Sequence, residues 1–140
     1  MHDCPFCKLL NEKGDRLLKE FDSVFVIFSD PRLLPGHILV IPKHHVEKIS
    51  ELSFAEKQEL FTIVEQYQEK IVSTIASGCD IRQNYRPFIK QGNLKVNHLH
   101  FHLLPRENED MLYKEVQHLE KDVFKALPQG ELEKYRGLLS

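Results

Sequence analysis

The chain has 140 residues, of which 41% are apolar and 29% charged, and its formal net charge is −2 at pH 7. This length suits one domain that buries a core without disulfide bonds. The small net charge gives no reason to expect a nucleic acid or a membrane surface as partner, and there is no apolar run of about eighteen residues to span a bilayer. The first residues lack the charged and apolar regions of a signal peptide, so we expect a cytoplasmic protein.

Two cysteines, Cys4 and Cys7, lie three residues apart near the start of the chain. The segment resembles a glutaredoxin-type redox motif, in which a thiolate lies at a helix N-terminus after a strand. Only three residues precede Cys4, which leaves no room for that strand. The same spacing is half of a structural zinc site, and this interpretation is favoured. The third cysteine, Cys79, is interpreted as a buried or incidental thiol.

The first half of the chain predicts a hairpin followed by a long helix. Residues 23–28 are β-branched and aromatic and predict a strand, and a turn-rich segment separates them from a second strand over 37–42. Ser53 and Glu56 have the spacing of a capping box, which begins a helix. Apolar residues then recur at helical spacing, and Gly78 is a plausible stop. These apolar positions are Leu60, Phe61, Val64, Tyr67, Ile71 and Ile75.

The second half predicts two more strands and a helical end. The strands are expected over about 81–88 and 95–104, and helix is expected over about 111–139 with a break near Pro128. Strands gathered around one long helix predict an α+β domain with a mainly antiparallel sheet. We expect residues 1–110 to form this domain and residues 111–140 to form a helical extension packed on it.

Three histidines alternate with apolar residues in the last predicted strand. Side chains alternate between the two faces of a strand, so His98, His100 and His102 share one face. The apolar residues between them face the other way and can pack on the helix. The imidazoles can ligate a metal, or one can attack a substrate while the others orient it or stabilise charge. Strand geometry alone does not decide between these two chemistries.

Two sequence blocks resemble those of a known family. The run His98-Leu99-His100-Phe101-His102-Leu103-Leu104 is similar to the defining motif of the histidine-triad (HIT) family, in which histidines alternate with apolar residues. A second block, earlier in the chain, resembles the family's PGH-x-LVIPK-x-H strand, and its residues are Pro35-Gly36-His37-Ile38-Leu39-Val40-Ile41-Pro42-Lys43-His44-His45. Both blocks occur in the family's order, with a long helix between them. The resemblance covers about residues 4–106 and implies a HIT-like α+β fold.

The resemblance implies covalent nucleotide chemistry. In the family the middle histidine, here His100, attacks the α-phosphate of a nucleotide while a backbone carbonyl holds its other ring nitrogen. His102 would then hold a phosphate oxygen or assist the leaving group, with His98 completing the triad and His37 lying beneath it. The expected activity is hydrolysis of a nucleoside phosphoramidate, a dinucleoside polyphosphate or a similar compound. A nucleotidyltransferase with a phosphate or sugar-phosphate acceptor is the alternative.

The resemblance also implies a structural zinc ion. Many bacterial relatives complete their cysteine pair with two histidines, which here correspond to His45 and His98, giving the set Cys4, Cys7, His45 and His98. Four protein ligands leave no open position for catalysis. His44 competes with His45, but neighbours on a strand face opposite ways. The family further implies a homodimer and a nucleotide substrate, which we expect to be a purine nucleotide.

Contacts to the sugar are left open by the sequence. Many family members carry Asp or Asn eight residues before the histidine that matches His37. Ser29 occupies that position here, and Asp30 follows it. Either side chain could reach a ribose hydroxyl, although Asp30 also suits the start of a turn before Pro31.

The loop before the triad departs from the family pattern. Family hydrolases carry Gly-Gln-Ser or Gly-Gln-Thr where this chain has Asn93-Leu94-Lys95. Asn84 could fill the role of a family asparagine, and Arg86 and Lys95 are candidate phosphate contacts. Arg86 is favoured because the odd spacing of Lys95 from His98 places it on the opposite face. The departure also keeps open a zinc-stabilised nucleotide-binding module with little catalysis.

Overall fold

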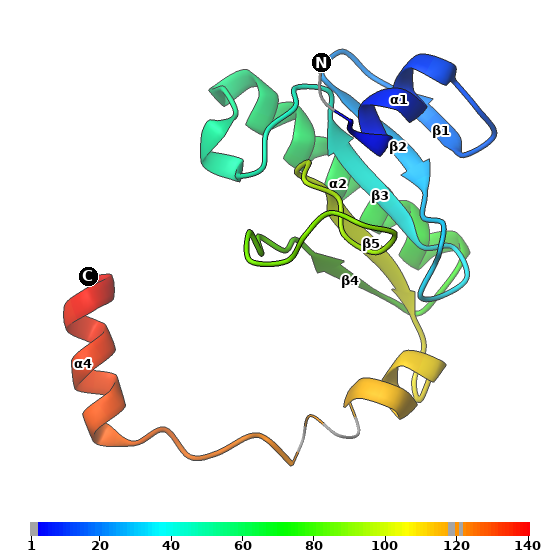
Figure 1. Cartoon of the computed structure of the whole chain (residues 1–140). Coiled ribbons are helices and arrows are strands. Elements are labelled where there is room, and N and C mark those ends of the chain that lie inside the picture. The colour runs from blue at the N-terminus through cyan, green and yellow to red at the C-terminus, as the bar shows by residue number, and fades with distance from the viewer. Residues whose placement is uncertain (1–2, 118–119, 121) are drawn as a thin grey trace. The chain divides into compact units, whose positions relative to one another are not determined.

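The computed structural model of the chain describes residues 3–117, 120 and 122–140. Five strands of the described chain form one antiparallel sheet in the order β1-β2-β3-β5-β4 (Figure 1). The strands are β1 (Leu17–Glu20), β2 (Val24–Phe28), β3 (Ile38–Pro42), β4 (Gly78–Arg82) and β5 (Phe101–Arg106). The helical elements before Asn108 are α1 (Pro5–Glu12), the short 3-10 helix η1 (Ile49–Glu51) and α2 (Phe54–Thr74). The expected α+β fold with an antiparallel sheet and one long helix is confirmed.

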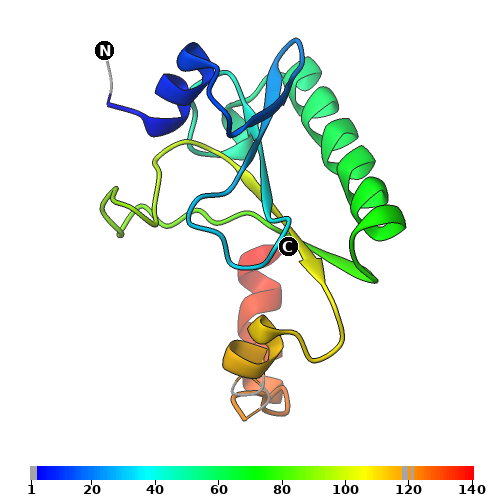
Figure 2. The ribbon, with the colours of Figure 1, turned by 90° about the vertical axis from the view of Figure 1, so that its right-hand side faces the viewer.

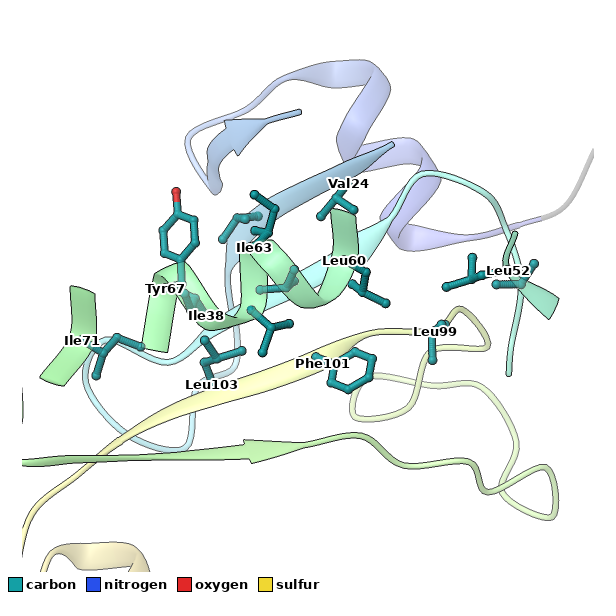
Figure 3. Close-up of a cluster of buried hydrophobic side chains, with 14 residues drawn as sticks. Val24, Ile38, Leu52, Leu60, Ile63, Tyr67, Ile71, Leu99, Phe101 and Leu103 are labelled. Carbon is teal, nitrogen blue, oxygen red and sulfur yellow. The ribbon is translucent and has the colours of Figure 1, made fainter. Parts of the chain in front are cut away.

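The two helices cover opposite faces of the sheet (Figure 2). Helix α2 packs on the face formed by alternate residues of β2, β3 and β5, and this cluster is drawn in Figure 3. Leu99, Phe101 and Leu103 belong to it, so the apolar residues of the triad segment pack against the helix as predicted. Helix α1 packs on the other face through Phe6. The alternation of side chains therefore leaves the histidines on the α1 side.

Helix α2 begins at the predicted capping box. The Ser53 hydroxyl accepts a hydrogen bond from the Glu56 amide, and the Glu56 carboxylate accepts one from the Ser53 amide. The buried stripe includes Ile63, which was not among the expected positions. Phe61 and Ile75 are instead 46% and 58% exposed, because they lie at the edge and beyond the end of this stripe.

The N-terminal elements α1 and β1 were not predicted. Cys4 is the N-cap of α1, where its sulfur accepts a hydrogen bond from the Cys7 amide at 3.5 Å, and Pro5 occupies the first turn. Strand β1 pairs with β2 and extends the sheet at one edge. A proline directly after a polar capping residue is a helix-start signal, although it predicts little in so short an element.

The strand expected over 81–88 was placed too late in the chain. Strand β4 runs from Gly78 to Arg82, and its register with β5 runs from Gly78 opposite Arg106 to Arg82 opposite His102. Helix α2 has already ended at Thr74. Pairing ends after Arg82 because β5 begins at Phe101 and offers little more backbone beyond that point.

The strand expected over 95–104 also begins later, at Phe101. The register of β3 with β5 would continue to Pro42 opposite Leu99, but proline has no amide proton to donate. The Leu99 amide donates instead to the Val46 carbonyl at 2.6 Å. His98 and His100 therefore lie just before the strand, and only His102 lies within it.

Residues 109–140 form a second compact unit, described here by itself. It contains the π-helical turn η2 (Tyr113–Gln117) and the helix α4 (Gln129–Leu139), which starts directly after Pro128. Residues 122–128 are not helical, so the expected break is longer than the sequence indicated; part of the expected helix, at 118, 119 and 121, lies outside the described residues. The packing of this extension on the first unit stays a prediction. No helix in the described ranges is long and apolar enough to cross a membrane.

Candidate active site and metal centre

Four histidines converge where β3 and β5 meet. His102 lies in β5, His100 directly before it and His37 directly before β3. The His100 and His102 ring centroids are 4.9 Å apart, and those of His37 and His102 are 5.2 Å apart. His98 lies at the other end of the triad, against the N-terminal cysteines. The structure thus brings together the histidines that the sequence singled out.

The hydrogen bond of the His100 ring shows which of its two nitrogens carries the proton. Its Nδ1 lies 2.6 Å from the His98 carbonyl oxygen, which can only accept, so Nδ1 carries the proton and donates it. The other nitrogen, Nε2, then holds a lone pair. Burial lowers the pKa of His100, against the smaller raising effect of the His98 carbonyl. A neutral imidazole with a free lone pair can act as a nucleophile.

A chain of hydrogen bonds assigns the protons of His37 and His102 as well. The Leu33 amide donates to His37 Nδ1 at 3.1 Å, which makes that nitrogen an acceptor. His37 Nε2 therefore carries the proton and donates it to His102 Nδ1 at 3.0 Å. His102 is left with its proton on Nε2. As a result, His102 Nε2 can donate a proton, and the neighbouring ring of His100 has a free lone pair on its own Nε2.

Both rings of this second pair are held neutral. Burial is the largest effect and lowers the pKa of His37 to about 4 and that of His102 to about 3. Repulsion adds to the shift: for His37 from Arg82 and from His100 when it is protonated, and for His102 from His100 and His37 when they are protonated and from Arg82. The expected position of His37 beneath the triad agrees with this geometry.

The residues expected to bind zinc form a compact cluster. One ligand atom from each of Cys4, Cys7, His45 and His98 lies within 4.8 Å of the other three. Sulfur-to-nitrogen distances are 3.4 Å for Cys4 to His98, 3.6 Å for Cys7 to His45 and 3.7 Å for Cys7 to His98. The two histidine Nδ1 atoms are 3.1 Å apart. Around a tetrahedral zinc the corresponding separations are about 3.6 Å and about 3.3 Å. The residues fit the metal.

Groups around this cluster support a metal more than a redox role. His98 Nε2 donates to the Pro42 carbonyl at 2.7 Å, which leaves Nδ1, the atom facing the cysteines, with its lone pair. Burial, with the neighbouring Cys4, raises the pKa of Cys7 to about 11, the opposite of a reactive redox thiol. His44 points elsewhere and contacts the Glu56 carboxylate at 3.2 Å. Of the adjacent histidines, only His45 faces the cysteines.

The residues proposed for the ribose lie in the loop between β2 and β3. The Ser29 hydroxyl donates to the Pro31 carbonyl at 2.8 Å, and its amide donates to the His37 carbonyl at 3.0 Å. The Ser29 side chain thus stabilises its own loop next to His37. Asp30 is exposed. Their roles toward a ribose stay predictions.

The candidate phosphate contacts occupy the loop between β4 and β5. Asn84 and Arg86 are exposed and lie beyond the end of β4, so the expectation that Arg86 lies in a strand was wrong. Lys95 is half-buried and its ammonium group contacts the Asn97 side chain. Leu94, at the position of the family glutamine, is 86% exposed. The roles of these three polar side chains toward a phosphate stay predictions.

Two residues of the site were missed by the sequence analysis. Phe6 packs edge-on against His100 at a centroid distance of 5.0 Å and against His98 at 5.9 Å. Arg82 is the direct cross-strand partner of His102. Phe6 lies between the two cysteines expected to bind zinc, which is a sequence signal for a place near the site, whereas the location of Arg82 follows only from the strand register.

The fold and this site define an α+β domain whose antiparallel sheet carries histidines on one face, at the neighbouring strands β3 and β5. The HIT domain family model matches residues 11–109, so the chain belongs to the histidine-triad family. It is 32% identical over 113 residues to a bis(5'-nucleosyl)-tetraphosphatase (asymmetrical) of Schizosaccharomyces pombe, covering 75% of this chain and 59% of that protein.

Two further comparisons agree with this assignment. An adenosine 5'-monophosphoramidase of the same yeast is 30% identical over 113 residues, covering 76% of this chain and 77% of that protein. A HIT family protein of Bacillus subtilis superposes with a TM-score of 0.73 at 22% identity, covering 99% of this chain and 95% of that one. The last likeness shows the shared fold.

Proposed function

We propose that this chain is a nucleotide hydrolase that cleaves at the α-phosphate through a covalent nucleotidyl-histidine on His100. The observation that carries the proposal is the 2.6 Å contact from His100 Nδ1 to the His98 carbonyl. This contact directs the lone pair of Nε2 away from the backbone and supports the positive charge that develops on the ring during attack. The two relatives named above, a tetraphosphatase and a phosphoramidase, support an enzyme of this class.

The reaction proceeds in two displacements. His100 Nε2 forms a bond to the α-phosphorus while the bond from phosphorus to the leaving group breaks. The leaving group takes the electron pair and, where it needs one, the proton on His102 Nε2. Water then attacks the phosphorus of the nucleotidyl-histidine and loses a proton, to His102 Nε2 where that ring has given one up and otherwise to solvent. The phosphorus–nitrogen bond breaks, its electron pair returns to His100 Nε2, and a nucleoside monophosphate is released. The assigned tautomers suit these roles, because one ring offers a lone pair and the other a proton.

The cysteine–histidine cluster is proposed to hold a structural zinc ion. Cys4, Cys7, His45 and His98 would bind it and so join α1 to the segment that carries the triad. When bound, the ion would supply fixed geometry and positive charge beside His98. With four protein ligands it has no open position for substrate. A purine nucleotide as substrate, a homodimer and a cytoplasmic location complete the proposal and come from the family resemblance and the sequence.

Trapping the intermediate tests the central claim. The protein would be incubated with a nucleotide labelled at the α-phosphate, quenched with alkali, and assayed for label on the chain that acid then releases. We expect acid-labile label on wild-type protein and on His44→Asn, whose imidazole contacts Glu56 outside the site. No label should appear on His100→Asn. Nucleotide binding without label or turnover in wild-type protein would support a binding module instead.

The fate of the label then separates hydrolase from transferase. Release of labelled monophosphate in water alone at the full turnover rate supports hydrolysis. If release required added phosphate or a sugar phosphate, and the label appeared on that acceptor, the activity would be nucleotidyl transfer.

A further inference from the structure

The site contains a cation that the proposed mechanism has not used. Arg82 ends β4 and lies directly opposite His102 of β5 in the antiparallel register. Side chains of directly opposed residues lie on the same face of the sheet, within reach of each other. The face is that of the histidines, because the residues flanking His102 belong to the cluster under α2. Arg82 therefore shares a face with the proton-donating ring.

The charge of Arg82 is not neutralised within the described part of the chain. Asp80 lies two residues earlier on the same strand face, but its carboxylate is paired with Arg106. No ion pair or hydrogen bond of the Arg82 side chain is found among the described residues. Arg82 is half-buried, and its positive charge lowers the pKa values of both His37 and His102. A guanidinium group on the same sheet face as neutral imidazoles, without an ion-pair partner in the described ranges, is suited to an incoming anion.

The other cations of the neighbourhood are less well placed. Arg86 lies four residues further along, exposed in the loop, and the Lys95 ammonium contacts Asn97. The polar pair that family hydrolases carry at the phosphate is replaced by Leu94 and Lys95, and Leu94 points into solvent. The loop thus lacks the donors usual in family hydrolases, and Arg82 adds a cation on the strand face that carries His102.

We infer that Arg82 selects substrates whose leaving group is itself a phosphate, such as a dinucleoside polyphosphate, over those whose leaving group is an amine. The inference rests on the proposed function. In that proposed mechanism the leaving group departs beside His102, on the far side of the α-phosphate from His100, and therefore on the side of Arg82.

The chemistry of the two leaving groups differs in a way that Arg82 distinguishes. In a polyphosphate the phosphorus–oxygen bond breaks and the electron pair stays on a phosphate oxygen, so negative charge builds up and a guanidinium stabilises it. In a phosphoramidate the phosphorus–nitrogen bond breaks and the nitrogen takes the proton from His102 Nε2. The departing amine carries no negative charge for Arg82 to stabilise.

A comparison of two substrates tests this assignment. The values of kcat/KM for diadenosine tetraphosphate and adenosine 5'-monophosphoramidate would be measured for wild type, Arg82→Ala, Arg82→Gln and Arg82→Lys. We expect Arg82→Ala and Arg82→Gln to lose roughly tenfold to a thousandfold on the polyphosphate. On the phosphoramidate the loss should stay below about threefold. Arg82→Lys should recover part of the loss, because it keeps the charge but not the planar fork.

Controls separate charge, folding and turnover. Lys19→Ala removes one positive charge from β1, an exposed strand at the opposite edge of the sheet from β4. It should leave kcat/KM unchanged for both substrates. Equal losses on both substrates, or no loss, would overturn the inference. Binding of inorganic pyrophosphate, measured by calorimetry, needs no turnover and should weaken about tenfold in Arg82→Gln; unchanged binding also overturns it. Failure of the proposed function would appear separately, as no label on wild-type His100.

Discussion

At the scale of single residues, the site is defined by where its protons lie. The His98 carbonyl and the Leu33 amide are groups that can only accept or only donate, and they assign the tautomers of His100, His37 and, through His37, His102. The neighbouring rings of His100 and His102 therefore have their protons on different nitrogens, Nδ1 in His100 and Nε2 in His102. His100 Nε2 has a free lone pair and His102 Nε2 a free proton, which suits a displacement that needs both a nucleophile and a proton donor.

The proposed role of His100 as nucleophile predicts that its replacement affects catalysis but not nucleotide binding. Replacing His100 with asparagine should lower kcat by about a thousandfold or more while the nucleotide Kd changes by less than about threefold, because only the covalent step is lost. Steady-state kinetics and calorimetry with a nucleoside monophosphate measure the two quantities. Full activity in this variant would exclude the covalent mechanism.

The lowered pKa values of His37 and His102 predict a pH dependence of stability. The unfolded chain binds protons on these residues below about pH 6.5, whereas the folded chain does so only near pH 4 and pH 3. Between these values the unfolded state binds more protons, so the free energy of unfolding falls as the pH falls. The contribution of these two histidines to the free energy of unfolding should be fully present above about pH 6.5.

Urea unfolding at pH 7 and pH 5 measures this effect. The loss of unfolding free energy between the two pH values should be smaller in His102→Asn than in wild type, since that variant has one titrating ring fewer. Both proteins keep the same cysteine–histidine cluster, so acid release of a metal affects them alike. An equal or larger loss in His102→Asn would contradict the prediction.

At the scale of elements, α1 connects the cysteine–histidine cluster to His100, the proposed nucleophile. Cys4 caps the helix, Cys7 lies in its first turn, and Phe6 between them packs on both His98 and His100. The triad segment is held from the other side by the bond from the Leu99 amide to Val46. The segment that carries His98 and His100 lies outside the β ladder and is thus held by a helix, the cysteine–histidine cluster and one backbone hydrogen bond.

Metal binding should therefore affect stability more than chemistry. Purified protein should contain about one zinc per chain, and Cys4→Ser should lower the free energy of unfolding by ~2 kcal/mol or more. Folded Cys4→Ser protein should keep most of its kcat. Metal analysis, unfolding and kinetics check the three statements, with Cys79→Ser as the control because Cys79 is a half-buried thiol outside the cluster. Absence of zinc, or lost catalysis in folded zinc-free protein, would reject the structural role.

At the scale of the whole molecule, the sheet sandwiched between α1 and α2 provides the frame, and residues 109–140 add a separate compact unit. Several apolar side chains of that unit are exposed in the single chain, among them Phe124 at 78% and Leu139 at 85%.

The family resemblance predicts a homodimer. Light scattering during size-exclusion chromatography should give twice the 16.5 kDa mass of the chain, and the mass should persist on dilution through the concentrations used for assays. A monomer throughout this range would contradict the expectation.

Much of the fold and site was determined by the sequence itself. The capping box at Ser53 began the long helix where predicted, and the alternation of His98, His100 and His102 with apolar residues put one set against α2 and the other on the opposite face. These are local properties, set by the period of a helix or strand and by side-chain chemistry. The spacing of the cysteines indicated half of a zinc site, and the family resemblance added His45 and His98, which the structure brings next to the cysteines.

Only the tertiary structure decided what depends on contacts between distant segments. The ends of β4 and β5 follow from where each strand finds a partner, so both were misplaced and Arg86 was assigned to a strand that stops at Arg82. For the same reason Arg82 was overlooked, because the register that sets it opposite His102 joins residues twenty positions apart. The protons of the imidazoles depend on a carbonyl and an amide supplied by the folded backbone, which no spacing in the sequence reveals.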